Sequence, residues 1–181
     1  MAPPKKAAKK AAKKAAGHHD PHKAAKDARR TFEHLGRVQA IASLTTSEND
    51  TLTLLTQTAD RAFRAEQYKD SADLLRAAEH LSFATLHHGV VEPVSDQLKE
   101  AIHEEFDHLL ERAEDHADHH LAPKAIRQLM ERMTRDAKDA LKHGSYRAAL
   151  ELARGAEALA HVDELKAAAL PPGKKHKQLQ G

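Results

Sequence analysis

Large apolar side chains are confined to one stretch of this chain, and within it they recur at helical spacing. Of the 33 Leu, Ile, Val and Phe residues among the 181 positions, 32 lie between positions 31 and 170. There they repeat every three or four residues, as Phe32, Leu35 and Val38 do, and no segment alternates with the period of two that marks a strand. The sequence therefore predicts an all-α fold, an antiparallel helical bundle or short helical array of about six to seven helices.

Glycine and proline divide this stretch into segments. Gly89 and Gly144 fit helix ends, and Pro93 and Pro123 fit first helical turns. Neither terminus can bury apolar surface, so we expect a disordered basic arm over 1–21, a helical domain over 22–170 and a disordered basic end over 171–181. The expected helices cover residues 22–43, 48–66, 69–88, 93–120, 123–143 and 145–160, followed by a short one over 161–169.

The chain has no cysteine, which excludes disulfides, thiolate catalysis and cysteine-type zinc sites. No apolar run is long enough to span a membrane, and the basic N-terminus lacks the apolar segment of a secretory signal. We therefore expect a cytoplasmic protein with no membrane span. The scattered glycines form no phosphate-binding loop, and no serine stands in a nucleophile elbow, so the sequence predicts a protein that is not an enzyme.

Two segments resemble each other at an offset of 78 residues, because residues 68–81 repeat several tyrosine, leucine, alanine and glutamate positions of residues 146–159. This predicts one helical hairpin used twice. Around Gly144, Tyr146 and Ala149 the second copy resembles the turn of a tetratricopeptide repeat. That resemblance implies a tetratricopeptide-like protein–protein adaptor with Gly144 and Tyr146 as turn residues. The family's period of about 34 does not divide 78, and a plain antiparallel bundle is the alternative.

The net charge of +2 is the sum of two positive segments and one negative segment. Residues 1–30 carry +8, residues 31–170 carry −9 and residues 171–181 carry +3. The Lys–Ala run over residues 5–16 repeats with a period of four, so its lysines would share one side of a helix. Like charges at that spacing oppose the free helix, and phosphates would remove the repulsion. The arm is therefore suited to ordering on a polyanion.

The arm resembles the Lys/Ala/Pro tails of linker histones and of bacterial histone-like proteins, which implies sequence-independent binding of DNA or RNA. It has no aromatic side chain for base stacking, so contacts to phosphate are expected. Solubility, an anionic membrane surface or an acidic protein are the alternative roles for the arm. The candidate nucleic-acid-binding residues are Lys5, Lys6, Lys9, Lys10, Lys13, Lys14, Lys23, Lys26, Arg29 and Arg30.

The helix expected over 93–120 is rich in histidine and carboxylates. His116 and His120 lie one turn apart, with His119 beside them, so these three residues are the candidate ligands of a divalent transition metal. A solvated acidic face is the alternative.

Together these features predict a non-catalytic helical scaffold whose basic arm binds nucleic acid. The body would bind a protein partner or form a homo-oligomer. A metal-binding helical protein and a tetratricopeptide-like adaptor remain the competing functions.

Overall fold

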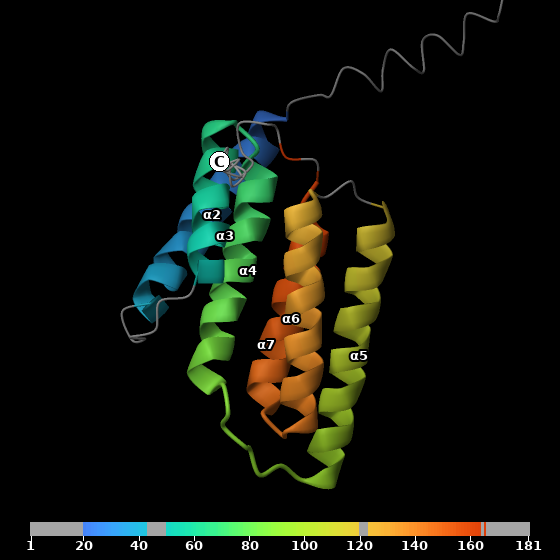
Figure 1. The fold of residues 1–181 in the computed structure, drawn as a ribbon. Helices are drawn as coiled ribbons and strands as arrows, with labels where there is room; N and C mark the ends of the chain where they lie inside the picture. Colours follow the sequence, from blue (N-terminus) through green and yellow to red (C-terminus); the bar gives the residue numbers. More distant parts are fainter. Residues whose placement is uncertain (1–19, 43–49, 120–122, 164, 166–181) are drawn as a thin grey trace, which may run out of the picture.

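The computed structural model describes residues 20–42, 50–119, 123–163 and 165, and in these it contains six α-helices and no strand (Figure 1). The all-α prediction is therefore confirmed. No helix in the described part is long and apolar enough to cross a bilayer. The helices are α2 (Pro21–Ala42), α3 (Asp50–Arg64), α4 (Tyr68–His87), α5 (Asp96–His119), α6 (Lys124–Lys142) and α7 (Tyr146–Ala160).

Two expected boundaries were wrong. The helix predicted to begin at Pro93 begins at Asp96, because the hydroxyl of Ser95 accepts the backbone N–H of Leu98 at 3.3 Å and caps the first turn. The seventh helix predicted over 161–169 is not formed at residues 161–163 or 165. The rest of that segment, residues 1–19 of the arm and the end 171–181 lie outside the described residues.

The chain is built from two three-helix halves that share the offset of 78. Adding 78 to the bounds of α2, α3 and α4 gives 99–120, 128–142 and 146–165, which overlap α5, α6 and α7. The packing repeats as well: α4 contacts α2 and α3, and α7 contacts α5 and α6. The sequence repeat seen in one hairpin therefore extends to a unit of three helices, which explains a period longer than that of two-helix repeats.

The two inner helices, α4 and α7, lie side by side at the centre and join the halves (Figure 1). Alanine dominates their buried positions. Ala77 and Ala78 on α4 and Ala149, Ala153 and Ala156 on α7 are each 0% exposed. Small side chains allow close approach of helices, so a chain with few large apolar residues still forms a continuous core.

The inner helices of both halves start from the same kind of turn. The N–H of Gln67 donates to the carbonyl of Ala62 at 2.9 Å, and the equivalent N–H of Ser145 donates to the carbonyl of Ala140 at 3.0 Å. Such a turn needs a left-handed residue, which Gly144 supplies with φ 73°. Glu66 takes the same conformation with φ 62°, although its Cβ disfavours it.

One interhelical ion pair is also repeated. Glu79 of α4 is held by His34 of α2 at 2.6 Å, and Glu157 of α7 is held by Arg112 of α5 at 2.9 Å. These pairs occupy equivalent positions, because an offset of 78 residues takes His34 to Arg112 and Glu79 to Glu157. In each half the pair fixes the outer helix against the inner one.

Candidate functional site

Both terminal segments of the chain attach at one end of the bundle. There α2 begins, and the chain continues beyond the end of α7 (Figure 1). Thr31 of α2 donates from its hydroxyl to the carbonyl of Tyr68 at 3.4 Å. Lys69 donates from Nζ to the carbonyl of His161 at 2.6 Å and pairs with Asp163 at 3.0 Å. The start of α4 therefore ties together the two places from which the basic segments lead away.

Four of the ten candidate nucleic-acid-binding residues are described, and they lie on the first turns of α2. Lys23 and Lys26 are exposed and form no ion pair with any described residue. Arg29 pairs with Glu33 at 2.7 Å, and Arg30 pairs with Asp27 at 3.6 Å. The other six, Lys5, Lys6, Lys9, Lys10, Lys13 and Lys14, lie outside the described residues.

The outer helices α2 and α5 occupy equivalent places in the two halves but carry opposite charge. Helix α2 has five basic and two acidic side chains, whereas α5 has two basic and nine acidic ones. The carboxylates from Asp96 to Asp115 are exposed, and among the described residues only Glu111 forms an ion pair, with His108 at 3.8 Å. The sequence alone showed the acidic helix but not its relation to the basic one.

The three candidate metal ligands are only partly described. His116 lies near the end of α5, where its Nδ1 is 2.7 Å from the carbonyl oxygen of Arg112. The side chain of His119 and the whole of His120 lie outside the described residues. Among the residues that are described, no group of three or more histidines and carboxylates is arranged to hold a metal ion. The metal site therefore stays a prediction.

His116 instead meets a histidine that the sequence did not single out. Its ring contacts that of His161 edge to face, with centroids 4.2 Å apart. Burial, His116 and the nearby Arg76 lower the pKa of His161 from 6.5 to about 4. The Nε and Nη2 atoms of Arg76 are buried without a hydrogen-bond partner among the described residues, and Nη2 lies 3.8 Å from Oδ1 of Asp73. The packing of α4 and α5 against α7 brings these groups together, so no spacing in the sequence could have indicated them.

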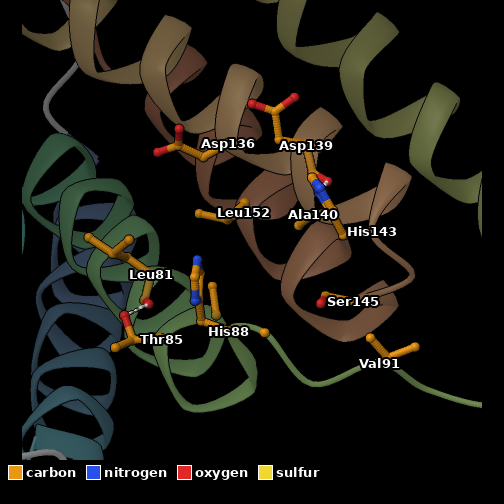
Figure 2. Close-up of a pocket in the computed structure, with 12 residues that line it drawn as sticks. Leu81, Thr85, His88, Val91, Asp136, Asp139, Ala140, His143, Ser145 and Leu152 are labelled. Carbon is orange, nitrogen blue, oxygen red and sulfur yellow. Dashed lines mark hydrogen bonds between the residues drawn. The ribbon is translucent and has the colours of Figure 1, made fainter.

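The opposite end of the bundle contains an open pocket of about 750 Å³ (Figure 2). Its walls come from the last turns of α4 and the residues after it, from α6, and from the turn into α7. Gly144 and Tyr146, the predicted turn residues, are the two chain neighbours of Ser145, which lines the pocket at that turn. The lining residues are Leu81, Ala84, Thr85, His88, Gly89, Val91, Asp136, Asp139, Ala140, His143, Ser145 and Leu152.

Apolar and polar groups occupy different parts of this pocket. Leu81 and Leu152 form the apolar floor, while Asp136 and Asp139 lie on the α6 wall (Figure 2). His88, just beyond the end of α4, projects into the space between α4 and α6 (Figure 2). The sequence analysis missed this pocket because its walls are distant in the chain.

No protein-family model, curated protein or solved structure matches this chain.

Proposed function

We propose that the protein is a non-catalytic helical scaffold whose basic arm binds nucleic acid through its phosphates, without regard to sequence. The charge of +8 over residues 1–30 carries this proposal. Lys23 and Lys26 support it, because both are exposed and unpaired within the described residues, at the point where the arm joins the body. We place the protein in the cytoplasm, associated with the nucleoid if the polyanion is DNA.

The body supports a tethering role through its asymmetry of charge. Phosphates attract the basic start of α2 and repel the exposed carboxylates of α5. Helix α7 ends at the same end of the bundle at which α2 begins (Figure 1), and Lys174, Lys175 and Lys177 add a charge of +3 to the sequence that follows. This arrangement favours a body held by one end.

The salt dependence of binding to a random-sequence DNA duplex tests the proposal. We expect fluorescence polarisation to give a slope of log K against log salt of roughly −7 if about eight phosphates are neutralised. Replacing the six lysines between Lys5 and Lys14 by glutamine should reduce the slope to about −2, because only about two contacts remain. Replacing the same six by arginine is the matched control and should keep the steep slope. An unchanged slope in the glutamine variant would refute the proposal.

The second candidate is a protein adaptor or homo-oligomer, in line with the tetratricopeptide-like resemblance. Its support is a group of exposed large apolar side chains around the α4–α5 linker, Leu86, Val90, Val91 and Leu98. Sedimentation velocity would detect self-association, and Leu98→Lys, on the first turn of α5, should abolish it. If the protein sediments as a monomer at all concentrations, the homo-oligomer proposal is refuted. The metal-binding alternative has less support, because His116 is already engaged with Arg112 and His161.

A further inference from the structure

The pocket at the α4–α6 end has a filled counterpart in the other half of the molecule. The pocket wall from α6 to α7 contains Asp136, Ala140 and Leu152, and subtracting 78 gives Thr58, Ala62 and Leu74. These three equivalents are 1%, 0% and 0% exposed, whereas Asp136 is exposed, Ala140 is partly exposed and Leu152 is 6% exposed. The α3 positions are therefore covered in one half, and their α6 equivalents are open in the other.

The segment that follows α7 is itself packed into the core. Val162 is 0% exposed and Leu165 is 4% exposed, and both belong to the hydrophobic core. This segment is fixed to the start of α4, since the N–H of Asp163 donates to Asp70 at 2.9 Å and its carboxylate pairs with Lys69 at 3.0 Å.

The linker that follows α4 is fixed in the same way but fills nothing. Glu92 pairs with Arg147 at 2.8 Å, and Arg147 is the equivalent of Lys69. Between the end of α4 and Glu92, however, Val90 is 47% and Val91 is 69% exposed. The anchor is therefore repeated, but the valines beside it stay exposed at the edge of the pocket.

We propose that this pocket binds a small organic cation with an apolar body, such as an aryl or alkyl amine. The volume of about 750 Å³ is that of a small-molecule site. Leu81, Ala84 and Leu152 supply apolar lining. An apolar ligand can pack against this lining.

The charge of the ligand follows from the lining. Asp136 and Asp139 line the pocket together with His88 and His143, and no lysine or arginine does. Asp139 pairs with Lys142 at 3.5 Å, but Asp136 forms no ion pair with any described residue. Thr85 donates its hydroxyl to the carbonyl of Leu81 at 2.9 Å, so its oxygen remains free to accept. These acceptors suit an ammonium group and repel a carboxylate or sulfonate.

Three dansyl probes that differ in charge test the proposal on the full chain. Dansylcadaverine carries an ammonium, dansylamide is neutral and dansylglycine carries a carboxylate. We expect fluorescence enhancement with the cationic probe at a dissociation constant at least about tenfold lower than with the anionic probe, which corresponds to 1.4 kcal/mol. Equal affinities, tighter binding of the anionic probe, or no binding of any probe would overturn it.

Variants locate the bound probe. Asp136→Asn should weaken dansylcadaverine binding about threefold or more and leave dansylamide unchanged, whereas Glu131→Gln, an exposed carboxylate on α6 outside the pocket, should change neither. Ala140→Leu should fill the pocket and weaken the binding of all three probes, with helicity checked by circular dichroism.

The backbone amide NMR signals of Gly89 and Gly144 should shift during the titration. Binding that persists unchanged in both pocket variants would place the probe elsewhere, as on acidic α5, and refute the proposal. The result is independent of the DNA measurement, because it involves neither terminal segment.

Discussion

Gly155 allows a specific test of how the two halves of the molecule diverged. It lies on α7, where an added Cβ would collide with the Cε methyl of Met133 on α6 and lie 3.6 Å from the carbonyl oxygen of Ala77 on α4. The equivalents of Gly155 and Met133 in the first half are Ala77 and Leu55, both 0% exposed. One half therefore combines alanine with leucine, and the other combines glycine with the longer methionine.

The single changes and the double change should differ in sign. Gly155→Ala displaces Met133, which costs about 1–3 kcal/mol as overpacking, and it gains about 1 kcal/mol of helix propensity. The net loss is roughly 0–2 kcal/mol. Met133→Leu removes the terminal methyl and should cost less than about 1.5 kcal/mol. The double variant restores the pairing of the first half, so its free energy of unfolding should equal or exceed that of the original chain.

Urea unfolding followed by circular dichroism measures the cycle. We expect a favourable coupling of at least about 1 kcal/mol between the two changes. Gly36→Ala is the matched control, because Gly36 is exposed on α2 with open space around its Cβ position. It should stabilise by about 1 kcal/mol and combine additively with Met133→Leu. Additivity of Gly155→Ala and Met133→Leu within about 0.5 kcal/mol would refute the argument from packing.

Three further predictions concern single side chains. Glu66→Gly should stabilise by about 1 kcal/mol and raise Tm by about 2–4 °C in a thermal melt, because Glu66 has the left-handed backbone that Gly144 has in the other half. His161 is protonated near pH 6.5 in the unfolded chain but only at about pH 4 in the folded one, so stability should fall as pH drops through that window, and His161→Gln should flatten this fall in urea titrations at several pH values. Glu79→Gln should cost about 1–3 kcal/mol in the same assay, since it loosens the bond to His34, while the exposed Glu33→Gln should leave the unfolding midpoint unchanged.

The helices themselves could be predicted because their apolar spacing is regular. Leu74, Leu109 and Leu159 lie within the predicted helices and are almost fully buried. The error at Pro93 has a physical cause: proline is tolerated in a first turn, but Ser95 is the better cap, and the helix starts there.

The three-helix repeat could not be predicted in full because its outer helices kept their positions and changed their chemistry. Thr31 on α2 and Leu109 on α5 are equivalent and buried, with 4% and 2% exposure, yet one is polar and the other apolar. Inverted surface charge hides the remaining similarity. The inner helices repeat visibly, because close packing of α4 against α7 restricts their buried positions to small residues.

The pocket could not be predicted for a different reason. Val90 and Val91 are the kind of residues that a sequence assigns to a core, and only the course of the linker reveals that they are exposed. Val162, in the segment that follows α7, is buried. Burial here depends on the path of a few backbone bonds after Gly89, which has φ 75°, and not on composition.

The attachment of both terminal segments at one end has a consequence for long-range electrostatics. Asp136 lies 12 residues along α6 from Lys124, which is at that end, so the two are separated by about 18 Å. At physiological ionic strength the Debye length is about 8 Å, so the potential of a polyanion bound at that end would fall to about a tenth over this distance. On the two proposals above, charge bound at one end should therefore change the affinity at the other only slightly, and by linkage the converse also holds. The bundle would then separate two sites that are nearly independent electrostatically.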